Sequence, residues 1–264
     1  MEPTTLLERV RYMKQTIQSS TTSLNFEEGA KILREGINSN IFIVSTQGKI
    51  LGYSLLSKFE CDYFKENIIE RGEFPAWYNE KFLLGTEESR TNIVQESDYC
   101  IFEKENTFEC KYRPEVLAVV PIVGEGERLG TLLLHRFEGE FGIDDIVMAE
   151  IGAGIISMEM MRAREERKIE ETRYRTIIDV AFGSLSYSEL EAMEEIFKEL
   201  DGGEGIVVAS KIADSLGITR SVIVNALRKF ESAGIIDSRS LGMKGTYIKV
   251  KTTLFKEEIF KRIS

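Results

Sequence analysis

Basic and hydroxyl-bearing side chains near the C-terminus have the types and spacing expected of contacts with DNA. Arg220 and Ser221 begin a predicted helix, and Lys244 lies between Gly242 and Gly245 in a predicted hairpin tip. Arginine can donate to guanine O6 and N7 together or to phosphate, serine offers a short donor, and a lysine at a hairpin tip suits a backbone phosphate. The pattern predicts a surface that binds DNA.

Two short helices and a hairpin are predicted to position these side chains. The first helix buries one face through apolar residues at Ile206, Val207, Ile212, Ala213 and Leu216. Gly217 ends it because glycine tolerates the positive φ of a helix end, and Thr219 is expected to cap the second helix with its hydroxyl. Strands at Ile235–Ser238 and Thr246–Val250 flank the tip at Leu241–Gly245. This order predicts a winged helix-turn-helix, whose second helix enters the DNA major groove.

Charge is distributed unevenly along the chain. The 264 residues carry a net charge of −10 at pH 7, and the pI is about 5.0. Residues 206–256 nevertheless contain nine basic and three acidic residues, a local charge of +6. Local charge governs phosphate binding, because charges beyond about 8 Å are screened at physiological salt. The acidic remainder is expected to suppress loose binding away from a specific site.

Length and composition indicate an ordinary protein of two domains. Hydrophobic residues make up 42% and charged residues 30%, and no apolar run approaches the roughly 20 residues that cross a bilayer. The charged, amphipathic N-terminus is unlike a signal peptide. The three cysteines lack metal-ligand spacing, and the single histidine, His135, is expected to be structural. We therefore expect a reduced cytoplasmic protein without a membrane segment, a metal site or a covalent cofactor.

The front of the chain predicts strands flanked by helices. Helices are expected at 4–18 and, capped by Asn25, from there to about 39. Strands are expected on either side of a Gln47-Gly48 turn within 40–54, at 99–102, and in a hairpin over 116–137; residues 57–84 are predicted to be helical and irregular. The Gly124–Glu127 turn lacks the phosphate-loop pattern, so it is interpreted as the hairpin turn. This mixed order favours an α+β sensor domain of the GAF or PAS type.

A long helix is predicted to follow, from Asp144 to about Val180. Its first half is apolar and its second half carries interspersed charges. The charged half is most simply a solvated face, and a dimer-forming helix is the alternative. A serine at 186 or 188 is expected to open the next helix. The predicted domains are therefore a sensor over 1–143, a linker helix over 144–182 and a winged helix-turn-helix over 183–264.

Five stretches of the chain carry a resemblance to a known family: SLSYSELEAMEEIFKELDG and ASKIADSLGITRSVIVNALRKFESAGIIDSRSLGMKGTYIKV near the C-terminus, and SNIFIV, GKILGYS and VPIVGEGERLGTLLL nearer the front. Together they resemble the CodY family of nutritional regulators of low-GC Gram-positive bacteria. The resemblance implies a GAF domain that senses isoleucine, leucine or valine, a linker helix, a winged helix, a homodimer and a response to GTP. It also implies repression of genes for amino-acid uptake and biosynthesis, stationary phase and virulence.

The resemblance implies DNA contacts at Ala213, Arg220 and Ser221, on an A/T-rich palindromic operator. The full set of candidate DNA-contacting residues is Ala209, Ser210, Lys211, Ala213, Thr219, Arg220, Ser221, Asn225, Arg228 and Lys244. The alternative for Arg220 is a merely solvent-exposed charge. The alternative for Ala213 is a small residue that lets two helices pack closely.

The resemblance also implies an amino-acid pocket built from residues 60–78 and 97–106. The candidates are Phe64, Lys65, Phe74, Pro75, Tyr78, Cys100, Phe102 and Lys104. The family binds the ligand's carboxylate with an arginine where this chain has Tyr63. A carboxylate in an apolar pocket requires a charged or multiply donating partner, so Lys65 or Lys104 is expected to replace that arginine. The alternative for the aromatic residues is an ordinary core.

A nucleotide site is implied at Ser45, Lys49, Glu159 and Arg164. Two arginines that often follow the serine in the family are replaced here by Thr46 and Gln47, which should weaken binding of a triphosphate.

The function that these observations favour is an effector-responsive transcription factor. A nucleotide-hydrolysing enzyme with a winged-helix appendage is the alternative, but the sequence shows neither a phosphate loop nor a metal-binding acidic cluster. A winged helix used for protein contacts is disfavoured by the local charge of +6.

Overall fold

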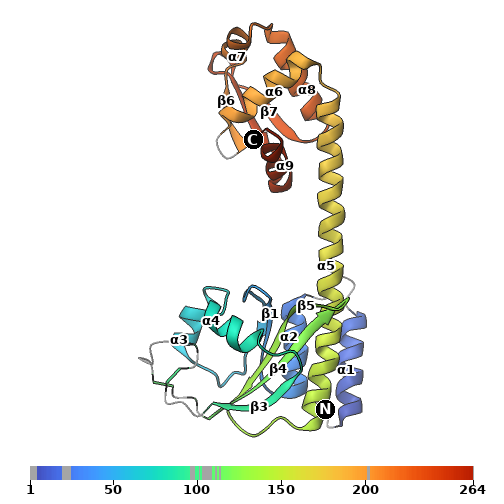
Figure 1. The fold of residues 1–264 in the computed structure, drawn as a ribbon, viewed down its shortest axis with the longest axis vertical. Coiled ribbons are helices and arrows are strands. Elements are labelled where there is room, and N and C mark those ends of the chain that lie inside the picture. The colour runs from blue at the N-terminus through green and yellow to red at the C-terminus, as the bar shows by residue number, and fades with distance from the viewer. Residues whose placement is uncertain are drawn as a thin grey trace. The chain divides into compact units, whose positions relative to one another are not determined.

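The computed structural model (Figure 1) describes residues 5–19, 25–95, 99–100, 102, 109–110, 112, 114–200 and 203–263. The chain divides into two compact units, Met1–Ala163 and Arg164–Ser264. The long helix α5 (Ile143–Gly183) contributes residues to both units. The boundaries of the three predicted domains remain predictions.

A five-stranded antiparallel sheet forms the centre of the first unit, in the order β2-β1-β5-β4-β3. The strands are β1 (Asn40–Ser45), β2 (Ile50–Ser54), β3 (Arg90–Gln95), β4 (Glu115–Gly124) and β5 (Glu127–Arg136). Because side chains alternate along a strand, neighbouring residues enter different cores. Ile41 and Ile43 pack on one side with α1, α2 and α5, whereas Phe42 and Val44 pack on the other.

Helices cover both faces of this sheet (Figure 1). On one face lie α1 (Leu6–Ser19), α2 (Phe26–Ile37) and the first part of α5. On the other lie α3 (Asp62–Phe64), the π-helical η1 (Lys65–Ile69), α4 (Ala76–Tyr78) and the π-helical η2 (Asn79–Leu83). The Asn25 side chain accepts a hydrogen bond from the Glu27 amide, which confirms the predicted cap of α2.

The predicted 116–137 hairpin is confirmed, with its turn at Glu125 and Gly126. Gly124 pairs with Glu127, and the two residues between them have φ of 53° and 80°. Positive φ at both central positions matches the twist of a tight hairpin. The interpretation of this segment as a turn is therefore correct.

Two segments of the first unit differ from what the sequence predicted. Of the expected strand at 99–102, Ile101 lies outside the described residues; Tyr99 makes an isolated bridge to Glu109, and Phe102 lies in a turn. The edge strand β3 was not predicted. Its sequence, RTNIVQ, is largely polar, and Asn92 has a φ of 53° beside a shift in register, so the alternation that marks a strand is interrupted.

The second unit begins within α5 and packs helices around a small sheet. Its elements are α6 (Tyr187–Glu199), β6 (Glu204–Val207), α7 (Ala209–Leu216), α8 (Arg220–Ser232), β7 (Ile236–Ser240), the short η4 (Gly242–Lys244), β8 (Thr246–Val250) and α9 (Thr253–Ile263). The sheet order is β6-β8-β7. Ser186 and Glu189 form a reciprocal capping box at the start of α6, which settles which of the two serines opens it.

The prediction that Ile206 and Val207 begin a helix was wrong. Both lie in β6, where Ile206 pairs with Tyr247 and Val207 with Thr246. Only Val207 is buried, because successive strand residues point to opposite faces. The helix begins two residues later, at Ala209.

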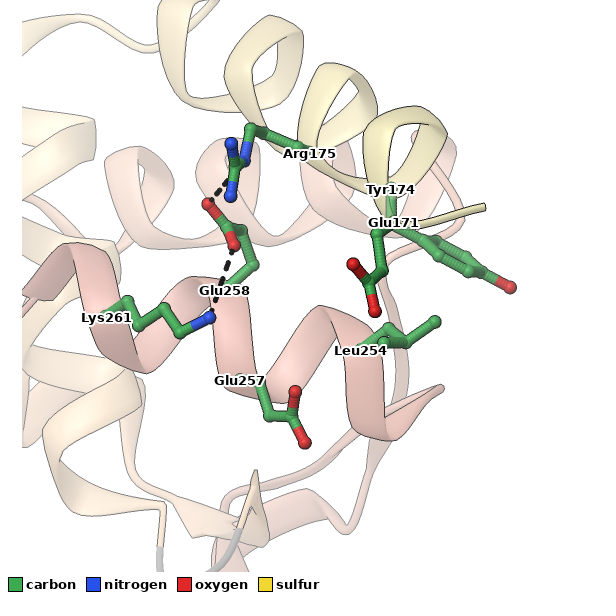
Figure 2. Close-up of a pocket in the computed structure, with 7 residues that line it drawn as sticks. All are labelled: Glu171, Tyr174, Arg175, Leu254, Glu257, Glu258 and Lys261. Carbon is green, nitrogen blue, oxygen red and sulfur yellow. Dashed lines mark hydrogen bonds and ion pairs between the residues drawn. The ribbon is translucent and has the colours of Figure 1, made fainter. Parts of the chain in front are cut away.

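The helix α9, which was not predicted, packs against the second half of α5. Figure 2 shows Arg175 and Lys261 on either side of the Glu258 carboxylate, at 3.1 and 4.0 Å. The rings of Tyr174 and Phe255 meet edge to face, with centroids 4.6 Å apart. The charged half of α5 is otherwise largely exposed in this chain, as a solvated face would be.

Candidate nucleic-acid interface and ligand pocket

The helix α8 presents a polar face because its apolar face is anchored in the core. Its buried residues are Ile223, Ala226, Leu227 and Phe230. The opposite face exposes Arg220, Ser221, Asn225 and Arg228. Gly217 has a φ of 66° and donates its amide to the Ala213 carbonyl, so α7 ends as predicted and the chain turns into α8.

The predicted cap of α8 by the Thr219 hydroxyl is wrong. Thr219 occupies the cap position, but its side chain makes no capping hydrogen bond. Its Oγ1 lies 2.7 Å from the Ser221 Oγ instead. The two hydroxyls therefore form one exposed pair at the start of α8, where the first amides of a helix remain available to an anion.

Not all candidate DNA-contacting residues are accessible. Ser210, Lys211 and Lys244 are exposed, as are the residues of the α8 face. Ala209 and Ala213 are 8% and 3% exposed and belong to the core of the second unit. This burial favours the packing alternative for Ala213, and it gives Ala209 a similar role.

The hairpin between β7 and β8 forms the wing, and Lys244 lies at its tip. The Leu241 amide donates to the Gly245 carbonyl across the tip at 2.8 Å. Gly245 has a φ of 109°, and a Cβ there would lie 2.6 Å from the Val207 carbonyl oxygen, so only glycine fits. Met243, beside Lys244, is fully exposed.

Three lysines of residues 206–256 are paired with carboxylates, and two of these carboxylates, Glu189 and Glu204, lie outside the segment whose charge was counted. Lys249 lies 3.4 Å from Glu204, and Lys251 lies 3.1 Å from Asp237. Lys229 donates to the Glu189 carboxylate at 2.7 Å and to the Ser184 carbonyl at 2.8 Å.

Five other basic residues of the second unit remain available to bind phosphate. Lys211, Arg220, Arg228, Arg239 and Lys244 are exposed and have no ion pair within the described part of the chain. They lie on α7, α8 and the wing, so the surplus charge lies on the elements that a winged helix-turn-helix presents to DNA.

Lys229 is the structurally important residue that sequence reasoning missed. It was counted only as one of the basic residues of the local charge. Its two acceptors connect the end of α5 and the start of α6 to α8. The hydrogen bond from Lys229, followed by that from the Ser186 amide, holds the pKa of Glu189 below its ordinary value.

The aromatic candidates for the amino-acid pocket lie together in the first unit. Ring centroids are 5.0 Å apart for Phe64 and Phe102, 5.8 Å for Phe74 and Tyr78, and 5.0 Å for Tyr78 and Phe102. All four side chains are buried, with Cys100, in the core on the α3–α4 side of the sheet. Pro75 immediately precedes α4. A ligand at this place would have to separate rings that contact one another.

The aromatic cluster contains a buried polar group, the Tyr78 hydroxyl. The Tyr78 hydroxyl is buried and has no hydrogen-bond partner within the described residues. Burial, with contributions from Glu115 and Cys100, raises the pKa of Tyr78 well above its ordinary value, so the hydroxyl keeps its proton. It is therefore a buried donor that a ligand's oxygen could accept from.

His135 is 1% exposed and packs against the rings of Phe59 and Phe137, with Nε2 3.5 Å from the Glu115 carboxylate. These contacts agree with the expected structural role.

The structure does not place either lysine that was expected to bind the ligand's carboxylate beside the aromatic cluster. Lys65 is exposed on η1, and Lys104 lies outside the described residues. Tyr63 is half-buried and packs beside the aromatic core. The replacement of the family's arginine by a lysine therefore stays a prediction.

The nucleotide candidates are divided between the two units. Ser45 and Lys49 flank the β1–β2 turn, and the Ser45 Oγ accepts from the Gln47 and Lys49 amides, both at 3.2 Å. Glu159 lies on α5 in the first unit, whereas Arg164 begins the second unit. The serine hydroxyl thus shapes its turn, and the four residues are not shown as one site.

Within the described ranges, no helix combines the length and apolar character that crossing a membrane requires. The same residues contain no group of three or more His, Cys, Asp or Glu side chains arranged to hold a metal ion.

Comparisons with known proteins identify both parts of the chain. Residues 5–184 match the CodY GAF-like domain, and residues 203–264 match the CodY helix-turn-helix domain. The global transcriptional regulator CodY of Clostridium perfringens strain SM101 is 49% identical over 258 residues, which cover 97% of this chain and 98% of that protein. The protein of the same name from Clostridium botulinum strain Hall is 48% identical over 257 residues, with the same coverage. Among solved structures, the cofactor binding GAF domain of the nutrient sensor CodY from Clostridium difficile is 30% identical and covers 59% of this chain and 97% of that chain, with a TM-score of 0.38.

Proposed function

The chain belongs to the CodY family of global transcriptional regulators, and we propose that it is an effector-responsive repressor without enzymatic activity. The predicted α+β fold, with a GAF domain, a long helix and a C-terminal helix-turn-helix, is confirmed. DNA and a small molecule are the partners that these two domains imply. The proposal further assigns it to the cytoplasm and to control of genes for amino-acid metabolism, stationary phase and virulence.

The observation that carries the proposal is the polar face of α8 above its buried stripe. Ile223, Ala226 and Phe230 are fully buried, so α8 is held rigidly with Arg220, Ser221 and Asn225 facing outward. The start of a recognition helix is the part that reaches base edges and phosphates. We assign base or phosphate contact to Arg220 and backbone contact to Lys244 in the wing. A homodimer would place two such helices on an A/T-rich palindromic operator.

The effector proposed for the first unit is a branched-chain amino acid. Its side chain would enter among Phe64, Phe74, Tyr78 and Phe102, replacing ring–ring contacts with contacts to the ligand. The buried hydroxyl of Tyr78 would donate to the ligand's carboxylate, together with Lys65 or Lys104. Burial of an isoleucine side chain is worth about 1.5–3 kcal/mol, so millimolar affinity also requires the carboxylate to be held.

Effector binding changes DNA affinity only through differential affinity for the two states of the protein. The expected gain in operator affinity is therefore limited, on the order of tens-fold. GTP is proposed as a second effector at Ser45, Lys49, Glu159 and Arg164. Its binding is expected to be weak, because Thr46 and Gln47 provide no cation at the β1–β2 turn.

Operator binding by Arg220→Ala tests the proposal. Loss of one bidentate contact costs about 1–3 kcal/mol per half-site, so the affinity of a dimer should fall at least tenfold while its melting temperature is unchanged. Ser221→Ala should have a smaller effect, and Arg167→Ala, an exposed arginine on α5, is the matched control. Unchanged affinity in Arg220→Ala would contradict the assignment of α8.

Two further measurements separate the alternatives. Calorimetry with isoleucine, leucine and valine should give heat at millimolar ligand, and Phe102→Ala should remove it. No heat with any of the three would mean that the effector site is absent. Release of phosphate from GTP would support the nucleotide-hydrolysing enzyme instead.

A further inference from the structure

A cleft of about 870 Å³ lies at one end of the helical layer of the first unit, and its lining residues include none of the candidate effector-binding residues. Its walls come from α1, the end of α2, the segment after β2, the end of β5 and the start of α5; they include Arg9, Tyr12, Arg34, Glu35, Leu56, Arg136 and Asp145. The cleft adjoins the start of β1, where Asn40 pairs with His135. The proposed nucleotide site adjoins the other end of β1, where Ser45 pairs with Gly130.

Three arginines line this cleft, and two of them share one carboxylate. Asp145 lies 3.2 Å from Arg9 and 3.1 Å from Arg136, and it also accepts from the Gly142 amide. Arg136 is fixed further by the Ile37 and Glu140 carbonyls. One carboxylate between two guanidinium groups leaves this wall of the cleft with a net positive charge.

The third arginine, Arg34, has only a partial partner. Its Nη2 lies 3.2 Å from the Glu35 carboxylate, and that carboxylate also accepts from the Tyr12 hydroxyl at 3.2 Å. The Nε atoms of Arg34 and Arg136 are both buried and have no hydrogen-bond partner within the described residues. Each guanidinium brings five donors, so the acceptors on these walls do not satisfy the donors present.

We propose that this cleft binds a small organic anion whose phosphate or carboxylate group is held by Arg34 and Arg9. A planar guanidinium matches two oxygens of either group, and three arginines against two carboxylates leave one positive charge to neutralise. The ring of Tyr12 and the side chain of Leu56 provide surface for an apolar body. The volume lies within the range of small-molecule sites. This inference does not depend on the proposed effectors or on DNA binding.

The test uses the full-length protein and three probes: phenyl phosphate, benzoate and the uncharged benzyl alcohol. Calorimetry should show that at least one anion binds with a Kd of about 1 mM or below, whereas benzyl alcohol does not bind. Preference for phenyl phosphate identifies a phosphate site, and preference for benzoate identifies a carboxylate site.

Two neighbouring variants should have opposite effects on the preferred probe. Arg34→Gln should lower the affinity for this probe about tenfold, because one charge-assisted contact is lost. Glu35→Gln should raise the affinity severalfold, because the carboxylate that competes for Arg34 is removed. Arg164→Gln, in the proposed nucleotide site, should leave the affinity unchanged. A melting curve for each variant confirms that it is folded.

Three results would overturn the proposal. They are no binding of either anion at about 10 mM, an equal affinity in wild type, Arg34→Gln and Glu35→Gln, or a loss of binding in Arg164→Gln. If Arg34→Gln fails to fold, the affinity of Glu35→Gln for the probe still tests the proposal, because the proposal requires it to exceed that of wild type.

Discussion

Replacing Lys229 by methionine should destabilise the second unit without removing a DNA contact. The ammonium donates to the Glu189 carboxylate at 2.7 Å and to the Ser184 carbonyl at 2.8 Å. Glu189 is 8% exposed, so in the variant a buried carboxylate keeps the Ser186 amide but loses its cationic partner. Methionine preserves most of the aliphatic stem, which limits the change to the charged group.

The expected loss follows from these two hydrogen bonds. A hydrogen bond to a charged group contributes about 1.5–3 kcal/mol when it is buried. The Lys229 side chain is 38% exposed, so water compensates part of the loss. We expect the free energy of unfolding to fall by about 2 kcal/mol at neutral pH.

The pH dependence of stability provides an independent test of the Lys229–Glu189 interaction. The pKa of Glu189 is lowered in the folded protein, so its contribution is present above the ordinary glutamate pKa and is lost as pH falls through the lowered value. Wild type should therefore lose stability below about pH 4, and Lys229→Met should lose less over the same range.

The assay combines urea unfolding with operator binding at several salt concentrations, and it uses the adjacent Arg228→Met as a matched variant. Arg228 is exposed and has no ion pair within the described residues, so its loss should leave stability unchanged. If Arg228 contacts phosphate, its loss should reduce the slope of log K against log salt by about 0.9 per half-site. The reasoning is refuted if Lys229→Met keeps wild-type stability and lowers this slope instead.

Three other outcomes are expected. Lys244→Ala should weaken binding to all DNA sequences about equally and lower the salt slope by about 0.9 per contact; altered sequence preference at constant slope would show that Lys244 reads bases. Gly245→Ala should cost more unfolding free energy than Gly126→Ala in urea titrations, because both have positive φ but only at Gly245 would the added Cβ lie 2.6 Å from the Val207 carbonyl oxygen; equal losses would show that this close approach costs nothing. Phe102→Ala should lower stability by about 3–5 kcal/mol, measured in the same way, as expected for a buried ring; a loss below about 1 kcal/mol would mean that the aromatic cluster is loosely packed.

The sequence predicted those elements whose patterns are local. The apolar spacing of α8, the glycine that ends α7 and the Glu125-Gly126 turn each depend on a few adjacent residues, and the structure agrees with all three. The irregular edge strand β3 carries no such pattern, and Ile206–Val207 are strand residues only because β8 pairs with them.

Side-chain pairing across the fold was not predictable from local patterns. The partner of Lys229 lies 40 residues away in sequence, so counting charges within one segment included this lysine in the local positive charge and did not reveal its ion pair. The aromatic residues of the predicted pocket were correctly grouped, because the resemblance to a family gave the segments and hydrophobicity gave the burial. Lys65 shows the limit of that reasoning, since a matching position on η1 does not make its side chain face the rings.

Lys229 should also transmit the effector response from the first unit to the recognition helix. The helix α5 is the covalent connection between the two units, and Lys229 hydrogen-bonds the carbonyl of Ser184, at its end, from within α8. A change at the end of α5 can reach the recognition helix through this hydrogen bond and through the packing of Phe182 on Phe230, because coupling requires contacts that differ between the two states.

We therefore expect isoleucine to raise operator affinity less in Lys229→Met than in wild type, with a coupling factor reduced by about fivefold from its tens-fold value. Arg175→Met, which removes the ion pair between α5 and α9 seen in Figure 2, is the comparison, because it disturbs α5 without touching α8. Affinities measured with and without isoleucine, on protein shown to be folded, give the factor for each. If Lys229→Met retains the full enhancement while Arg175→Met loses it, the response passes through α9 and not through the recognition helix directly.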